Sequence, residues 1–167
     1  MSSTAHRAEA PVSVVVSVIT VSDTRTLETD TSGRAVVELL EAAGHRIGRR
    51  EILKDEPSEV ERAVRRVIAD PEVDVVITTG GTGITSRDST YEAIDRVLEK
   101  RLDGFGELFR MLSYPEIGAA AMLTRATAGL AGGTIVIALP GSEHAVRLGM
   151  TKLVLPEIGH LVWEARR

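Results

Sequence analysis

The chain has 167 residues, 43% of them hydrophobic and 26% charged, and its formal net charge is −4. This is the balance of a globular protein that buries its own core, and the acidic excess argues against a nucleic-acid partner, because such proteins need surplus Lys and Arg to neutralise phosphates. Cys is absent, which excludes disulfides, thiolate catalysis and cysteine-based zinc or iron–sulfur sites.

The amino-terminal residues carry no apolar segment, and nowhere does the chain approach the roughly 20 consecutive apolar residues of a membrane span. We therefore expect a disordered tail over residues 1–11 and a single domain over residues 12–167. We also expect a cytoplasmic protein with no membrane partner. No repeat or low-complexity segment divides the domain.

Strand and helix patterns alternate along the domain. The first half predicts a strand over 12–21, a helix over 34–43, a strand over 45–53, a helix from 57, a strand over 73–77 and a helix from 90. The second half predicts short helices over 105–112 and 116–123 joined around Pro115, a strand over 134–139, and helices over 144–155 and 156–163. This alternation implies right-handed crossovers and a mostly parallel sheet covered on both sides, which is a three-layer α/β/α fold.

Capping residues support several helix ends. Thr31 or Ser32 is the expected N-cap of the first helix, and Gly44 stands where a left-handed C-cap residue belongs. Ser89 and Glu92 have the spacing of a capping box at the start of the helix from residue 90.

Three of the buried strands end in loops of unusual composition. Their sequences are Ser22-Asp23-Thr24, Gly80-Gly81-Thr82-Gly83 and Pro140-Gly141-Ser142. Ligands of open parallel sheets bind beyond the carboxyl ends of the strands, so the three loops would share one crevice if their strands are neighbours.

The glycine loop suits an anion. Glycine lets the backbone approach a phosphate closely with successive N–H groups facing it, and Thr82 adds a hydroxyl. The loop has neither the Gly-Lys-Ser/Thr ending of a Walker A motif nor the G-x-G-x-x-G spacing of the dinucleotide fingerprint. Taken alone, it is equally consistent with a tight turn.

Charged residues flank this loop. Arg87 and Asp88 precede a helix directly after it, which suits a Mg²⁺–phosphate site, although Asp88 could instead only cap that helix. Asp55 follows the second strand, and its position taken alone favours the interpretation that it only marks the entry to the next helix. The histidines have no metal-ligand spacing, and His144 is expected to be a solvated residue at a helix start.

A family resemblance joins these motifs. Residues 79–90, TGGTGITSRDST, resemble the signature of the MoaB/Mog family of molybdenum cofactor biosynthesis proteins, which includes the G domain of gephyrin. Residues 21–24 and 139–142 are similar to its other signature loops, and residues 109–118 resemble the MoaB branch in particular. The resemblance extends from about residue 14 to about residue 155, in the family's order.

The resemblance implies a molybdopterin-binding α/β fold that assembles as a homotrimer or as a hexamer made of two trimers, with contacts to other cofactor-biosynthesis enzymes. Active members adenylate molybdopterin, using ATP as co-substrate and Mg²⁺. Asp55 and Asp88 match the aspartates tied to catalysis, and both are candidate Mg²⁺ ligands. The candidate substrate and phosphate contacts are Ser22, Asp23, Thr24, Gly80, Gly81, Thr82, Gly83, Arg87, Thr124, Pro140, Gly141 and Ser142.

The chain departs from the family pattern at one loop. Active adenylyltransferases usually read Pro-Gly-Asn-Pro where this chain has Pro140-Gly141-Ser142-Glu143. Adenylyl transfer to molybdopterin is therefore the leading hypothesis, and a non-catalytic protein that binds molybdopterin or its precursor is the alternative. A generic phosphate-binding enzyme is a third interpretation, which the missing dinucleotide spacing disfavours.

Overall fold

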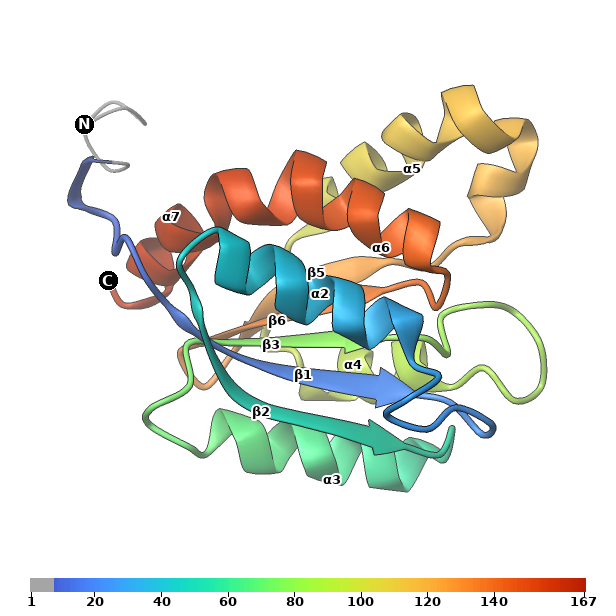
Figure 1. Cartoon of the computed structure of the whole chain (residues 1–167), viewed down its shortest axis with the longest axis horizontal. Helices are drawn as coiled ribbons and strands as arrows, with labels where there is room; N and C mark the ends of the chain where they lie inside the picture. The colour runs from blue at the N-terminus through green and yellow to red at the C-terminus, as the bar shows by residue number, and fades with distance from the viewer. Residues whose placement is uncertain (1–7) are drawn as a thin grey trace.

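The computed structural model describes residues 8–167, and six strands form one sheet in the order β2-β1-β3-β6-β5-β4 (Figure 1). Four of them are parallel, namely β2 (Arg46–Leu53), β1 (Val15–Val21), β3 (Val75–Thr79) and β6 (Thr134–Leu139). Two antiparallel strands complete one side of the sheet, namely β5 (Thr127–Ala131) and β4 (Lys100–Arg101). The carboxyl ends of β1, β3 and β6 thus lie next to one another.

Helices cover both faces of the sheet (Figure 1), which confirms the predicted three-layer α/β/α fold with a mostly parallel sheet. One layer contains α2 (Thr31–Ala42), α5 (Asp103–Ile117), α6 (Glu143–Gly149) and α7 (Leu155–Ala165). The other layer contains α3 (Pro57–Ile68) and α4 (Thr90–Val97). A 3₁₀ turn, η1 (Gly118–Leu123), follows α5, and a π-helical turn, η2 (Met150–Val154), joins α6 to α7.

The period of a strand distributes the side chains of β1 between two cores. Val16 and Val18 belong to the core under α2 and α5–α7, whereas Ile19 and Val21 belong to the core under α3 and α4. Successive side chains of a strand point to opposite faces, so a β-branched run without polar breaks must be covered on both sides. The strands β3 and β6 are buried along their whole length for the same reason.

Several sequence predictions of local structure were wrong. Residues 103–117 form one continuous helix that contains Pro115, because this proline stands in the last turn, where the helix is already ending at Gly118 (φ +61°). The strands β4 and β5 were missed: β4 has two residues, and β5, with sequence TAGLA, has little of the β-branched content that marks a strand.

Two predicted caps also differ in the structure, while a third is confirmed. Asp30, not Thr31 or Ser32, caps α2 by accepting the Gly33 N–H at 2.9 Å. The Ser89–Glu92 capping box does not form. Gly44 has the left-handed conformation expected of it (φ +87°).

Membrane-spanning helices were not expected from the sequence. Each helix found in residues 8–167 is too short or too polar to span a bilayer.

Candidate functional site

The three loops predicted to share a crevice lie together at one edge of the sheet. The Gly80 N–H donates to the Leu139 carbonyl at 3.0 Å, so the glycine loop is bonded to the end of β6. A Cβ added to Gly141 would lie 3.3 Å from the Gly80 Cα, which shows how closely the two loops approach. The Ser22 N–H donates to the Leu53 carbonyl at 2.8 Å and joins the loop after β1 to the end of β2.

Glycine is required at two successive positions of the loop. Gly80 (φ +91°) and Gly81 (φ +67°) both adopt left-handed conformations that residues with a side chain rarely adopt. A Cβ at Gly80 would lie 2.3 Å from the Val21 carbonyl oxygen, and a Cβ at Gly81 would lie 2.1 Å from the Thr90 Oγ1. The loop therefore crosses directly over the end of β1 and the start of α4 without room for a methyl group.

Several successive backbone N–H groups of this loop have no acceptor in the described chain. Within the described chain, the successive N–H groups of residues 81–84 donate no hydrogen bond. The loop's carbonyl groups, by contrast, are occupied: Gly81 accepts from the Thr90 N–H at 3.0 Å, and Thr82 and Gly83 accept from the Arg125 guanidinium. A run of free N–H groups beside satisfied carbonyls is the arrangement of a backbone anion site.

A cavity of about 380 Å³ lies against the loop. Its lining includes many of the predicted contacts, namely Gly81, Thr82, Gly83, Asp88, Thr124, Pro140 and Gly141, together with the apolar Ala120 and Leu123. The Thr124 Oγ1 is buried and has no hydrogen-bond partner in the described chain. An unpaired buried hydroxyl carries a desolvation cost, and Thr124 is one of the residues of the cavity wall.

The two candidate aspartates flank the glycine loop from opposite ends. Asp55 is 7% exposed, and its Oδ1 accepts from the Ser89 N–H (3.2 Å) and the Ser89 Oγ (2.5 Å). Its Oδ2 approaches Gly81, where an added Cβ would lie 2.8 Å away. Glu56 occupies the N-cap position of α3 without a side-chain capping hydrogen bond. The contacts with Ser89 and Gly81 therefore show that the Asp55 carboxylate faces the glycine loop and the start of α4.

Asp88 closes the other end of the loop. Its Oδ2 accepts from the Thr85 N–H (2.9 Å) and the Thr85 Oγ1 (2.6 Å), and it lies 2.7 Å from the position that a Cβ on Gly83 would take. This carboxylate stabilises the turn within the loop and does not cap α4, whose N-cap residue is Ser89.

Arg87 ties three loops together. Its Nε and Nη2 donate to the Asp23 carboxylate at 3.1 Å, and its Nη1 and Nη2 donate to Glu56 at 3.1 Å. The Arg87 guanidinium, and next the Asp55 N–H, hold the pKa of Asp23 below its ordinary value, and the two carboxylates raise the pKa of Arg87. The positive charge of Arg87 is therefore balanced by Asp23 and Glu56 within the protein.

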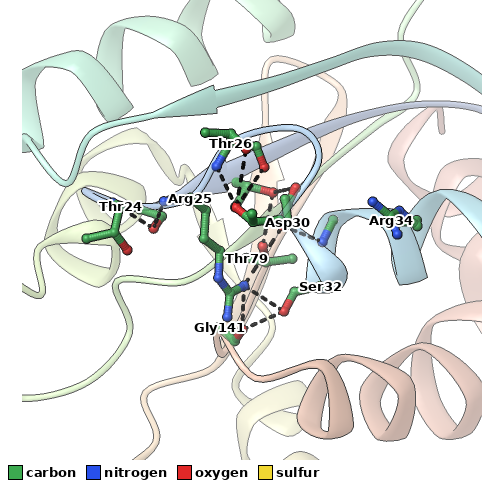
Figure 2. Close-up of polar contacts among 12 residues, drawn as sticks. Thr24, Arg25, Thr26, Asp30, Ser32, Arg34, Thr79 and Gly141 are labelled. Carbon is green, nitrogen blue, oxygen red and sulfur yellow. Dashed lines mark hydrogen bonds and ion pairs between the residues drawn. The ribbon is translucent and has the colours of Figure 1, made fainter.

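A network of polar contacts surrounds the buried Asp30 beside the site (Figure 2). Asp30 is fully buried and accepts from the Thr20 Oγ1 (2.8 Å), the Arg50 Nη2 (3.0 Å) and the Gly33 N–H (2.9 Å). Burial alone would raise the pKa of Asp30, but these three hydrogen bonds outweigh it and hold the pKa below its ordinary value. The network ties β1, β2 and the start of α2 into one unit.

Arg25 joins this network to the last of the three loops. Its Nη1 donates to the Ser32 Oγ (2.9 Å) and to the Gly141 carbonyl (3.0 Å), and the Ser32 Oγ donates to the same carbonyl at 2.5 Å (Figure 2). The peptide group after Gly141 is therefore fixed in orientation. Because a carbonyl and the following N–H point to opposite sides of a trans peptide, the Ser142 N–H faces away from Arg25.

Other predicted contacts do not line the cavity beside the glycine loop. The Ser22 Oγ accepts from the backbone N–H groups of Thr24 (3.3 Å) and Arg25 (3.1 Å), and so shapes the turn after β1. Ser22 and Asp23 line a neighbouring cavity of about 500 Å³. The Ser142 Oγ caps α6 by accepting the Ala145 N–H at 3.2 Å.

Sequence reasoning missed Arg25, Arg125, Ser32, Thr90 and Asp30 as contributors to the site. Arg25 and Arg125 directly follow predicted contact residues, and that adjacency was the only available signal. The others belong to the starts of helices, where Ser, Thr and Asp are ordinary caps. His144 lies exposed at the start of α6, as predicted, and pairs with Glu116 at 2.5 Å.

The carboxylate oxygens of Asp55 and Asp88 are of the kind that a magnesium ion accepts as ligands. No group of three His, Cys, Asp or Glu residues within residues 8–167 could hold a metal ion by itself. Asp55 and Asp88 offer carboxylates on the two sides of a phosphate-type loop, and Mg²⁺ is commonly bound by one or two carboxylates plus substrate phosphates and waters. Asp55 and Asp88 would hold such an ion jointly with the phosphates.

Comparisons with known proteins show the family to which the chain belongs. Residues 17–160 match the family model described as "Probable molybdopterin binding domain". Molybdenum cofactor biosynthesis protein B of Bacillus subtilis is 52% identical over 100% of this chain and 99% of its own length. A crystal structure of a molybdenum cofactor biosynthesis protein B is 52% identical with a TM-score of 0.91, and the match covers 95% of this chain and 99% of that one. The tungsten cofactor synthesizing protein MoaB from Pyrococcus furiosus is 41% identical, with 95% and 100% covered and a TM-score of 0.85.

Proposed function

Because this chain belongs to the MoaB family of molybdenum cofactor biosynthesis proteins, with a molybdopterin-binding domain, we propose that it binds molybdopterin and adenylates it with Mg-ATP. One observation carries the proposal: the four successive N–H groups of residues 81–84 donate no hydrogen bond in the described chain, and residues 81–83 line a cavity between the carboxylates of Asp55 and Asp88. This arrangement suits phosphate groups that arrive with a divalent cation.

The proposed reaction is a displacement at phosphorus. An oxygen of the terminal phosphate of molybdopterin attacks the α-phosphorus of ATP, the bond from that phosphorus to the bridging oxygen breaks, and pyrophosphate leaves with the bonding electrons. Such chemistry needs positioning and charge neutralisation more than covalent participation by the protein. Bound Mg²⁺ supplies part of that neutralisation.

The protein's own groups have separate roles in this proposal. The N–H groups of the glycine loop bind a phosphate and lower the repulsion between the two anionic reactants. Asp55, held by Ser89, and Asp88, held by Thr85, contribute metal-binding oxygens with fixed orientation. Thr124 directs its hydroxyl to the ligand, since that hydroxyl has no partner in the described chain.

A product assay tests the proposal. Purified protein is incubated with molybdopterin, ATP and Mg²⁺, and adenylylated pterin is detected by mass spectrometry. We expect product with the wild type, and a loss of on the order of a hundredfold or more with Asp88→Asn, as is typical when an electrostatic group of the transition state is removed. Absence of product, under conditions in which an active adenylyltransferase forms it, would reject the proposal.

The alternative is a protein that binds the pterin without reacting. It is favoured by Ser142, whose side chain is used to cap α6, and by Arg87, whose charge is already balanced by Asp23 and Glu56. Under this alternative the wild type binds molybdopterin, forms no adenylylated product, and Asp88→Asn changes only the affinity.

We also propose that copies of the chain meet at the outer surface of α5 and η1. Large exposed apolar side chains gather there, namely Leu108, Met111, Tyr114, Ile117, Met122 and Leu123. A cavity of about 600 Å³ with a mainly apolar lining lies among them. A cluster of exposed apolar side chains of this kind is typical of a protein–protein interaction site.

Sedimentation analysis checks this interface. We expect the wild type to sediment as a trimer or hexamer and Met111→Asp to dissociate, because the new carboxylate would have to be buried without a partner. Val12→Asp, which changes an equally apolar and 92% exposed residue elsewhere, is the matched control and should leave the assembly unchanged. An unchanged assembly in Met111→Asp would place the interface on another surface.

A further inference from the structure

Arg125 contacts the glycine loop through its carbonyl groups. Its Nε donates to the Gly83 carbonyl at 3.0 Å and to the Thr82 carbonyl at 3.3 Å, and its Nη2 donates to the Gly83 carbonyl at 2.5 Å. These contacts join residues more than forty positions apart in the sequence. The glycine loop is therefore held by a residue that does not belong to the segment between β3 and α4.

The guanidinium is itself held in place by α4. Its Nη1 forms an ion pair with the Glu92 carboxylate, and its Cζ lies 5.0 Å from the centre of the Tyr91 ring. The Arg125 side chain is 27% exposed, so these interactions are partly shielded from water. Glu92 and Tyr91 belong to the helix that begins directly after the loop, and Arg125 therefore braces the loop against that helix.

This contact determines where the loop's donors point. In a trans peptide the carbonyl and the following N–H lie on opposite sides of the bond. When Arg125 holds the carbonyls of Thr82 and Gly83, the N–H groups of Gly83 and Ile84 must face away from the guanidinium. Those two N–H groups belong to the run that donates no hydrogen bond in the described chain.

We propose that Arg125 is a positioning residue that orients the glycine loop for anion binding by holding the carbonyls of Thr82 and Gly83. Its positive charge is balanced by Glu92, so it acts through the loop's peptide groups rather than as a direct anion ligand. The identity of the anion as a nucleotide phosphate rests on the proposed function, but the orientation of the loop does not.

The first measurement needs no ligand. Hydrogen exchange is followed in the segment that contains the Thr85, Asp88 and Thr90 N–H groups, which are bonded to Asp88, Thr85 and Gly81 respectively. In Arg125→Ala we expect their exchange to accelerate by about tenfold or more, because loss of the brace lets the loop open locally. In Arg125→Lys, which keeps the charge but has no planar fork to bridge two carbonyls and a carboxylate, we expect a smaller acceleration.

Arg65→Ala is the matched control: Arg65 donates two hydrogen bonds to Glu61 on α3 and one, at 3.4 Å, to the Arg96 carbonyl in the last turn of α4, at the end of that helix away from the glycine loop. It should leave exchange in this segment unchanged. Equal exchange in Arg125→Ala and the wild type would overturn the proposal. If Arg125→Ala unfolds, Arg125→Lys decides the question in the same way, because an unchanged protection pattern in that variant would also contradict the brace.

Calorimetric binding of Mg-ATP is the second measurement. We expect Arg125→Ala to weaken binding by about tenfold or more and Arg65→Ala to leave it unchanged. If the wild type binds no Mg-ATP while Arg125→Ala still loses local protection, the proposed function fails and the positioning role stands. If Arg125→Ala loses protection but binds Mg-ATP as the wild type does, the loop's orientation does not serve anion binding and the proposal is overturned.

Discussion

Replacement of Gly81 by alanine separates backbone strain from steric conflict at the centre of the site. The left-handed conformation of Gly81 (φ +67°) costs an alanine about 1–2 kcal/mol. The added methyl group would also lie 2.1 Å from the Thr90 Oγ1 and 2.8 Å from the Asp55 Oδ2. Neither neighbour is the free end of a flexible side chain, since Thr90 and Asp55 are both buried.

The steric conflict of the added methyl group with Thr90 and Asp55 should cost about as much as an overpacked core, about 1–3 kcal/mol. Gly81→Ala should therefore lower the free energy of unfolding by about 2–5 kcal/mol. Gly44→Ala supplies the reference, because Gly44 has a similar left-handed conformation (φ +87°) and no atom within 4 Å of its added Cβ. It should cost only the strain, about 1–2 kcal/mol.

Urea unfolding of both variants measures the difference. A double variant sharpens it: Thr90→Ala removes the hydroxyl that meets the new methyl group, and this hydroxyl has no hydrogen-bond partner to lose. In that background Gly81→Ala should cost about 1 kcal/mol less than it does alone. Equal destabilisation by Gly81→Ala and Gly44→Ala would refute the steric part of the reasoning.

Three further outcomes are expected. Asp30→Asn should lower the free energy of unfolding at pH 7 by about 2–4 kcal/mol, because Arg50 loses its buried partner. The folded-state pKa of Asp30 lies below its ordinary value, so this stabilisation is present above about pH 4 and is lost as pH falls through the folded-state pKa. Urea unfolding curves of the two proteins should therefore converge in acid, and a constant difference between them would contradict the role of the network. Thr124→Val should leave the midpoint of urea unfolding unchanged or raise it, because the hydroxyl that is removed has no partner in the described chain. The same substitution should weaken molybdopterin binding, measured by calorimetry, by about tenfold. An unchanged affinity would exclude Thr124 from the site. Ser142→Asn keeps a good cap and should shift the free energy of unfolding by less than about 0.5 kcal/mol in urea unfolding, and a loss above about 1 kcal/mol would show that the serine does more than cap α6.

The parts of the fold that sequence predicted are those with a periodic signal. The β-branched run of β1 and the apolar stripes of α3 and α4 each reveal an element and the number of its covered faces. The strand β5 was missed because it takes its place from pairing with β6, and its own sequence contains a glycine and two alanines. Hydrogen bonding of β5 to β6 does not require a periodic pattern of side chains in β5, so the sequence of β5 contains no signal of a strand.

The candidate site was predictable to a similar degree. The strand-end loops could be found because parallel strands bring their carboxyl ends together. Asp55, taken alone, indicated only the entry to a helix, and the family resemblance assigned it to the site. Arg125 could not be found, since its contacts with Gly83 and Glu92 depend on how α4 and the turn after η1 are packed. The function of Arg87 was also not apparent, because its ion pairs with Asp23 and Glu56 join three separate loops.

Release of pyrophosphate under single-turnover conditions tests the central claim most directly. Protein in excess over molybdopterin is mixed with Mg-ATP, and pyrophosphate is counted against the pterin supplied. If the glycine loop and the two aspartates form an adenylyl-transfer site, one pyrophosphate is released per molybdopterin, none is released without the pterin, and Asp55→Asn abolishes the release. Binding of molybdopterin and Mg-ATP with no pyrophosphate released would contradict the account and identify the site as one that only binds.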